Sequence, residues 1–123
     1  MKANEYFSRG FNCSESVLLA AGDRLKTGSR LIPRIATGFG AGMASGSVCG
    51  AATGALMALS IKFGRDSGGE GSSLAYEKSR RFLKRFKEEL GSTQCRELKG
   101  THCVDCHKCV ETAETILNDL LEE

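Results

Sequence analysis

Six cysteines are the residues of this 123-residue chain whose chemistry stands out. The N-terminal sequence, Met1 to Phe7, is polar and charged, so we expect no secretory signal and a cytoplasmic location. Thiols stay reduced in the cytoplasm, which disfavours a static disulfide framework. We therefore expect metal ligands, cluster ligands or redox thiols. The six are Cys13, Cys49, Cys95, Cys103, Cys106 and Cys109.

Four of these cysteines closely follow residues that commonly cap α-helices. The pairs are Asn12 with Cys13, Ser47 with Cys49, Thr93 with Cys95, and Asp105 with Cys106. Unpaired N–H groups and the helix dipole favour an anion in a first helical turn. A thiol placed there loses its proton more easily, and the thiolate is both the nucleophile and the metal ligand. The pattern therefore predicts four activated thiols at helix N-termini.

The segment from Thr101 to Cys109 is compatible with several chemistries. Cys103-x-x-Cys106-His107 matches the haem c attachment pattern, which the expected cytoplasmic location disfavours. Three cysteines spaced by two residues match part of a ferredoxin ligand set, although the proline that usually follows is absent. Three cysteines with His102 or His107, or four cysteines, would hold zinc. Cys103 and Cys106 could also form a dithiol couple, without the βαβ setting of thioredoxin-like proteins.

Helices are expected to position these groups, because apolar residues recur at helical spacing and no alternating strand pattern is present. The predicted helical segments are Ala3–Arg9, the helix from Asn12 to near Gly28, Arg34–Thr37, Val48–Phe63, Ser73–Leu90, a turn at Ser92–Leu98, and a last helix from about Cys106. The predicted inward-facing residues of the last two long helices are Tyr76, Phe82, Leu83, Phe86 and Leu90, then Val110, Ala113, Ile116, Leu117, Leu120 and Leu121. The chain is thus predicted to be all-α, a single domain over residues 1–123. It would be a bundle of about five helices, with a Gly-rich loop before the central helix.

Small residues recur every four positions along the central helix, at Gly50, Gly54 and Ala58. Such a face lets another helix or a cofactor approach closely. Tight helix packing alone is one interpretation. A cofactor beside Cys49, or a homodimer across this face, is another.

The charge pattern excludes some classes of partner. A basic helix over Ser73–Leu90 and an acidic last helix are expected to lie side by side, each keeping a solvated face. The net charge is only +2 and no aromatic platform accompanies the basic residues, so we expect no nucleic-acid partner. The uncharged stretch from Ile35 to Ile61 is rich in glycine, so we also expect no membrane partner.

The chain resembles the family of redox-active proteins named for a C-GCAxxG-C-C pattern of four cysteines. The matching segments are Gly10–Cys13, Thr37–Met43, Val48–Leu56, Cys95–Leu98 and Cys106–Val110. The most specific of them is Cys49-Gly50-Ala51-x-x-Gly54, with Gly38-Phe39-Gly40 upstream. The resemblance covers most of the chain and implies an all-helical redox protein that binds an iron–sulfur cluster. A similar domain occurs in the split-Soret type of multihaem cytochrome.

Position by position, the resemblance implies family cysteines at Cys13, Cys49, Cys95 and Cys106, the four that follow capping residues. Cys103 and Cys109 are additional, and they leave the ligand set open.

We therefore expect an oxidoreductase or electron carrier whose catalytic thiols and ligands are Cys13, Cys49, Cys95 and Cys106. They would bind an iron–sulfur cluster for electron transfer with a redox partner protein, or cycle between thiol and disulfide. Cofactor contacts are expected at Gly50 and Gly54. The alternative is a zinc-binding structural module using Cys103, Cys106, Cys109 and one remote cysteine. His102 and His107 are less favoured metal ligands.

Overall fold

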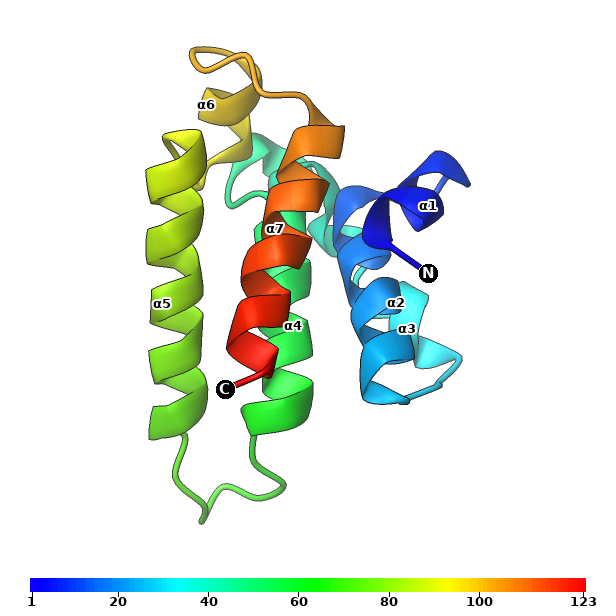
Figure 1. The fold of residues 1–123 in the computed structure, drawn as a ribbon, viewed down its shortest axis with the longest axis vertical. Helices are drawn as coiled ribbons and strands as arrows, with labels where there is room; N and C mark the ends of the chain where they lie inside the picture. The colour runs from blue at the N-terminus through cyan, green and yellow to red at the C-terminus, as the bar shows by residue number, and fades with distance from the viewer.

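Seven α-helices and no β-strand form the computed structural model, which describes residues 1–123 (Figure 1). The helices are α1 (Ala3–Ser8), α2 (Cys13–Leu25), α3 (Leu31–Arg34), α4 (Gly50–Phe63), α5 (Ser73–Leu90), α6 (Cys95–Lys99) and α7 (Cys106–Leu121). The all-α prediction is confirmed. The number of helices is seven rather than about five. The short helix predicted at Arg34–Thr37 lies earlier, as α3 over Leu31–Arg34, and the turn predicted at Ser92–Leu98 is a helix only from Cys95 to Lys99. No helix has the length and apolar character needed to cross a bilayer.

The segment before α4 is folded, rather than an open Gly-rich loop. A 3-10 turn (Thr37–Phe39) is followed by a five-residue turn (Gly42–Gly46). Ala41, Met43 and Ala44 have left-handed backbones, with φ of 54°, 59° and 57°. Non-glycine residues adopt this region at a cost in free energy, and such residues cluster at functional sites.

The central helix α4 packs against α2, α5 and α7 (Figure 1). Its alanines are small enough to let these neighbours lie close, and Ala51, Ala55 and Ala58 are fully buried. A Cβ added at Gly54 would lie 2.6 Å from the carbonyl oxygen of Ser14 in α2. The small-residue face of α4 is therefore covered by α2 of the same chain. It is not free for a second copy at Gly54, and the homodimer itself stays a prediction.

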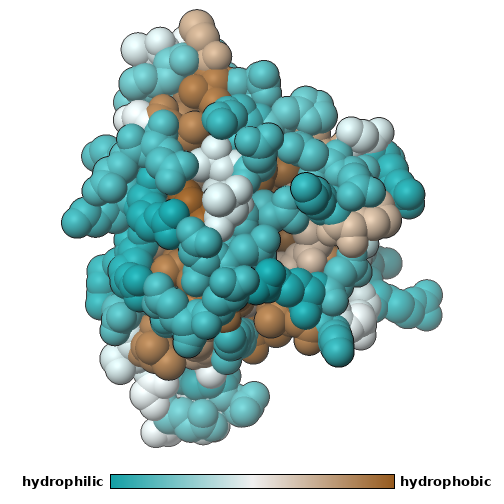
Figure 2. Space-filling model, in the orientation of Figure 1, coloured by the Kyte–Doolittle hydropathy of each residue, from teal (hydrophilic) through white to brown (hydrophobic).

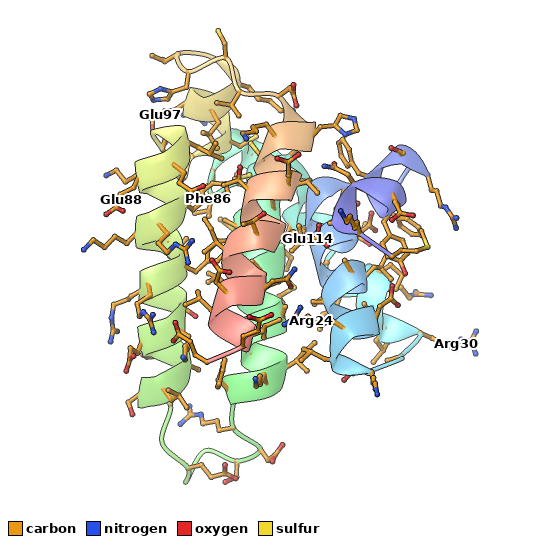
Figure 3. The ribbon with its side chains drawn as sticks, viewed as in Figure 1. Arg24, Arg30, Phe86, Glu88, Glu97 and Glu114 are labelled. Carbon is orange, nitrogen blue, oxygen red and sulfur yellow. The ribbon has the colours of Figure 1, made fainter.

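Helices α5 and α7 close the other side of α4. All six residues predicted to face inward from α7 are at most 2% exposed. In α5, Phe82 and Phe86 are fully buried and stack with their ring centroids 5.8 Å apart (Figure 3). Tyr76 was predicted to face inward, but it is 60% exposed. The buried stripe of α5 instead runs in steps of four residues through Lys78, which is 6% exposed.

Ion pairs join the basic α5 to the acidic α7, as the charge pattern predicts. Arg85 contacts Asp119 at 3.0 Å, and Glu123 accepts hydrogen bonds from Arg81 and Lys78, each at 2.6 Å. Hydrophilic side chains cover most of the face that these helices present (Figure 2). Hydrogen bonds from Arg81 and Lys78 lower the pKa of the Glu123 carboxyl from 4.5 to about 2.

Glu123→Gln is expected to lower the melting temperature at neutral pH and to make it less dependent on pH in acid. Because the pKa is lowered on folding, the pair stabilises the native state above pH 4.5, and this contribution is lost as the pH falls toward 2. Melting curves at low and high salt measure it, since salt screens an exposed pair. Glu122→Gln is the control, because Glu122 pairs with Arg24 on the other side of α7. Equal acid sensitivity of Glu123→Gln and the parent chain would contradict the prediction.

Candidate functional site

Five of the six cysteines line one cavity of about 230 Å³. The cavity lies at the end of the bundle where α2, α4, α6 and α7 begin (Figure 1). The five are Cys13, Cys49, Cys95, Cys106 and Cys109. The structure thus brings together the four cysteines predicted to form the site and adds Cys109 to them.

Each of the four predicted cysteines stands at the beginning of a helix. Cys13, Cys95 and Cys106 are the first residues of α2, α6 and α7. The expected caps of α2 and α7 are present. The Asn12 side chain accepts from the Glu15 N–H at 2.9 Å, and the Asp105 side chain accepts from the Lys108 N–H at 2.9 Å.

The predicted caps of α4 and α6 were wrong. Cys49 is itself the N-cap of α4, and Gln94 is the N-cap of α6. Ser47 and Thr93, which were predicted as the caps, instead join the beginnings of α4 and α6 through backbone hydrogen bonds. The Cys49 N–H donates to the Thr93 carbonyl, and the Cys95 N–H donates to the Ser47 carbonyl, both at 2.7 Å. This short bridge holds Cys49 and Cys95 on the same side of the cavity.

Side chains also tie the end of α5 to α6. The Ser92 hydroxyl donates to the Glu97 carboxylate at 2.6 Å and accepts from the Gln94 N–H at 2.9 Å. Glu97 lies at the cysteine end of the bundle, next to the end of α5 (Figure 3). These bonds fix the turn that presents Cys95.

Two glycines make room for the cysteines. A Cβ at Gly50 would lie only 2.4 Å from the Cys13 sulfur. A Cβ at Gly42 would lie 2.8 Å from the Cβ of Cys95, and Gly42 has a left-handed φ of 64°. Neither Gly50 nor Gly54 is a lining residue of the cavity, and a Cβ at Gly54 would meet Ser14. Of the two glycines predicted to approach a cofactor, only Gly50 borders a cysteine sulfur.

The pKa of the Cys49 thiol is lowered to about 7. The largest cause is a hydrogen bond with Cys109, and the N–H groups of Ala51 and Ala52 at the start of α4 add to it. Lys99 favours the thiolate further by its charge. The hydrogen bond with Cys49 raises the pKa of Cys109, which keeps its proton.

Burial raises the pKa of Cys13, against a hydrogen bond from the Ala41 N–H that favours its thiolate. The left-handed Ala41 is thus used to aim a backbone donor at a cysteine sulfur. Burial also raises the pKa of Cys95. Lys99 is the only charged side chain that lines the cavity, and the charge of the Cys106 thiolate is the largest cause of the raised pKa of its ammonium group.

The metal-free protein is expected to contain one thiol that reacts near neutral pH. The rate of alkylation by iodoacetamide should rise through a midpoint near pH 7 as the Cys49 thiolate forms, because only the thiolate is nucleophilic. Cys49→Ser should remove this phase, and Lys99→Met should move it to higher pH. Cys103→Ser is the matched control, since the exposed Cys103 lies outside the cavity. A single phase at the pH of an ordinary thiol would contradict the prediction.

Lys99 was not among the predicted site residues, and Cys109 was predicted only as a less favoured metal ligand. Lys99 follows Cys95 by four residues and Cys109 follows Cys106 by three, so helical spacing places each pair on one face. That spacing was the signal available.

Neither histidine lies at the cavity. The His107 ring packs edge-on against Phe7 at 4.7 Å, with Nδ1 at 3.1 Å from the Asn4 side-chain oxygen. The His102 ring lies against Gly91. Cys103 also points elsewhere, with its thiol donating to the Gly100 carbonyl at 3.3 Å.

The five thiols surround a space instead of converging on a point. No three Cys, His, Asp or Glu side chains are arranged to hold a single metal ion. The cavity volume of about 230 Å³ is many times what one water molecule needs. Protein interiors are usually close-packed, so a cavity of this size suits an occupant of several atoms.

Comparison with family models decides the classification. A family described as "Putative redox-active protein (C_GCAxxG_C_C)" matches residues 11–120. The chain belongs to this family. The match confirms the resemblance noted from the cysteine motifs and includes all six cysteines.

As a C_GCAxxG_C_C family member, the chain has Cys49 and Gly50 in the opposite order to the central motif in the family name. Searches of curated proteins and of solved structures found no significant match. The family description gives the general class, a redox-active protein.

Proposed function

We propose that the cysteine-lined cavity binds an iron–sulfur cluster and that the protein transfers electrons through it. The observation that carries the proposal is the meeting of four helix N-termini, each with a cysteine, around one cavity of about 230 Å³. Cysteine thiolates are the usual ligands of iron–sulfur clusters, so the donor set fits the group. When bound, the cluster would supply one-electron oxidation and reduction.

Cys13, Cys49, Cys95 and Cys106 would be the ligands. All four are presented by helix N-termini, where the dipole favours a thiolate. Cys109 would then remain a thiol that donates to the Cys49 sulfur. The nearby cation of Lys99 would offset part of the negative charge of four thiolates.

Backbone donors around the sulfurs would tune the reduction potential. The Ala41 N–H faces Cys13, and the Ala51 and Ala52 N–H groups face Cys49. Hydrogen bonds to ligand sulfurs stabilise the more negatively charged, reduced state and raise the potential. The mostly apolar lining, with Phe7, Leu98 and Val104, would limit access of water.

Metal analysis of anaerobically purified protein tests the proposal. We expect iron and acid-labile sulfide in stoichiometric amounts, with broad visible absorption that bleaches on reduction. Protein that takes up neither iron nor sulfide on anaerobic reconstitution, or that contains stoichiometric zinc alone, would overturn it.

A second candidate function is thiol–disulfide exchange by Cys49 and Cys109. It is favoured by one observation: Cys49 and Cys109 line the same cavity, where Cys109 lowers the pKa of Cys49. Cys49 would attack a disulfide of the partner, and Cys109 would then release the partner as a thiol by forming the Cys49–Cys109 bond. A disulfide-linked pair of peptides carrying these cysteines, found by mass spectrometry after mild oxidation, supports this function. No observation favours the zinc-binding module, because Cys103 lies outside the cavity that Cys106 and Cys109 line.

A further inference from the structure

A second, larger cavity is an apolar groove between α3 and α4, with a volume of about 630 Å³. It shares no lining residue with the cysteine cavity. The floor comes from α2 and α4, and the outer wall from α3 and the 3-10 turn. Its apolar lining residues are Leu18, Leu31, Ile32, Ile35, Phe39, Leu56, Met57 and Ile61. This volume and this composition are those of a small-molecule site, which occupies roughly 300–1,000 Å³.

The hydroxyl groups in the lining are already used within the chain. The Thr53 hydroxyl donates to the Gly50 carbonyl at 3.0 Å, and the Ser60 hydroxyl donates to the Leu56 carbonyl at 2.8 Å. The Ser29 hydroxyl accepts from the Leu31 N–H at 3.2 Å. The groove therefore offers its occupant an apolar surface with few free polar groups.

The groove leaves apolar side chains open to water. Leu31 is 65% exposed, Ile35 is 62% exposed and Ile61 is 41% exposed. Helix α4 is apolar on all sides, which is typical of a helix that is covered by other elements all round. The side with Met57 and Ile61, however, faces the groove and has no protein element over it. Covering such a surface with an apolar ligand is favourable.

The segment of the chain that supplies most of the lining has charge of one sign. Between residues 24 and 65, which include nearly all of the lining, the chain has six basic residues and no acidic one. Three of the six, Lys26, Arg30 and Arg34, are exposed and take part in none of the salt bridges of the structure. Each adjoins a lining residue in the chain, and the Arg30 side chain extends from the loop before α3 (Figure 3). A long, flexible arginine there can turn toward an anionic group at the groove.

We propose that the groove between α3 and α4 binds a free lipophilic anion, a single alkyl or acyl chain that ends in a carboxylate. The chain would lie along α4 from Thr53 to Ile61, a rise of about 12 Å. The carboxylate would lie beside Arg30 and Arg34, at the wall that α3 forms. The site is independent of the function of the cysteine cavity and would add ligand binding to a redox protein.

Titration calorimetry with decanoate, below its micelle concentration, tests the proposal on the full chain. Octanoate should bind more weakly, because each methylene moved from water into the groove tightens binding about fourfold. Decanol and decyltrimethylammonium, which carry the same chain without the anion, should both bind more weakly than decanoate.

Two variants locate the site. Arg30→Glu with Arg34→Glu should weaken decanoate binding about fivefold or more, through loss of attraction and new repulsion. Arg80→Glu with Lys84→Glu on α5 is the matched control, because it makes the same change in charge away from the groove, and it should leave decanoate binding unchanged. Ser60→Phe should fill the groove from an exposed position and abolish binding, with an unchanged helical circular-dichroism signal.

Several results would overturn the proposal. One is the absence of decanoate binding to a folded protein, including the case in which the groove is covered by a second copy and the protein is a dimer in solution. Another is equal binding of decanol and decanoate, or equal loss in the α5 control. Binding to vesicles of phosphatidylglycerol and phosphatidylcholine without binding to free decanoate would identify a membrane surface as the occupant instead.

Discussion

Replacing any one of Cys13, Cys49, Cys95 or Cys106 by serine is expected to remove nearly all bound iron and the visible absorption. A thiolate ligand replaced by a neutral hydroxyl leaves one iron of the cluster without its usual ligand. Iron and sulfide content after anaerobic reconstitution measures the effect. Cys103→Ser is the matched control, because this exposed cysteine is outside the cavity and the variant should bind as much iron as the parent chain.

Cys109→Ser tests which four of the five cavity cysteines are ligands. In the proposed arrangement Cys109 only donates a hydrogen bond to Cys49, so this variant should keep its iron and change its reduction potential. If Cys109→Ser loses iron while Cys13→Ser retains it, the ligand set is Cys49, Cys95, Cys106 and Cys109. Iron content that is unaffected by any single cavity substitution would contradict cluster binding at this site. Iron-free protein throughout, with a Cys49–Cys109 disulfide after oxidation, would support thiol–disulfide exchange.

Gly50→Ala is expected to lower the stability by about 1–3 kcal/mol, the usual cost of overpacking a buried position. The added Cβ would lie 2.4 Å from the Cys13 sulfur and 2.8 Å from the Phe39 carbonyl oxygen, so both α2 and the 3-10 turn must move. The melting temperature should fall by several degrees for each kcal/mol, and cluster binding should weaken because Cys13 is displaced.

Gly38→Ala is the control for Gly50→Ala, because a Cβ at Gly38 meets no atom within 4 Å. It lies in the same motif region and should leave both the melting temperature and the iron content near those of the parent chain. A Gly50→Ala protein as stable as the Gly38→Ala protein would show that the contact with Cys13 is easily relieved.

Local sequence patterns accounted for most of the secondary structure. The capping box of Asn12 and Glu15, the apolar spacing of α7 and the bounds Ser73–Leu90 of α5 were all confirmed. These features depend on interactions within a few residues, so the sequence contains them directly. The predicted start of α4 was wrong, because the position of this helix end depends on a hydrogen-bond partner far along the chain. The Cys49 N–H is held by the Thr93 carbonyl, and Cys49 rather than Ser47 becomes the N-cap.

The features of the cysteine site also fall into those that local sequence predicts and those that depend on tertiary packing. That Cys13 and Cys106 begin helices followed from the capping residues before them, and the family pattern selected these two together with Cys49 and Cys95. That the fifth cysteine of the cavity is Cys109 and not Cys103 depends on where the turn before α7 directs each side chain. The contribution of Lys99 and the exposure of Tyr76 likewise depend on which elements pack beside them.

The sequence by itself thus determined the long helices, the caps of α2 and α7 and the residue types capable of redox chemistry, because each of these is decided by neighbours within about one helical turn. Only the tertiary structure decided which helix beginnings meet, which sulfur lies next to which donor, and that an apolar groove stays open between α3 and α4. The physical reason is that these features arise from packing between segments distant in the chain, where glycines and alanines of α4 allow close approach and larger side chains prevent it.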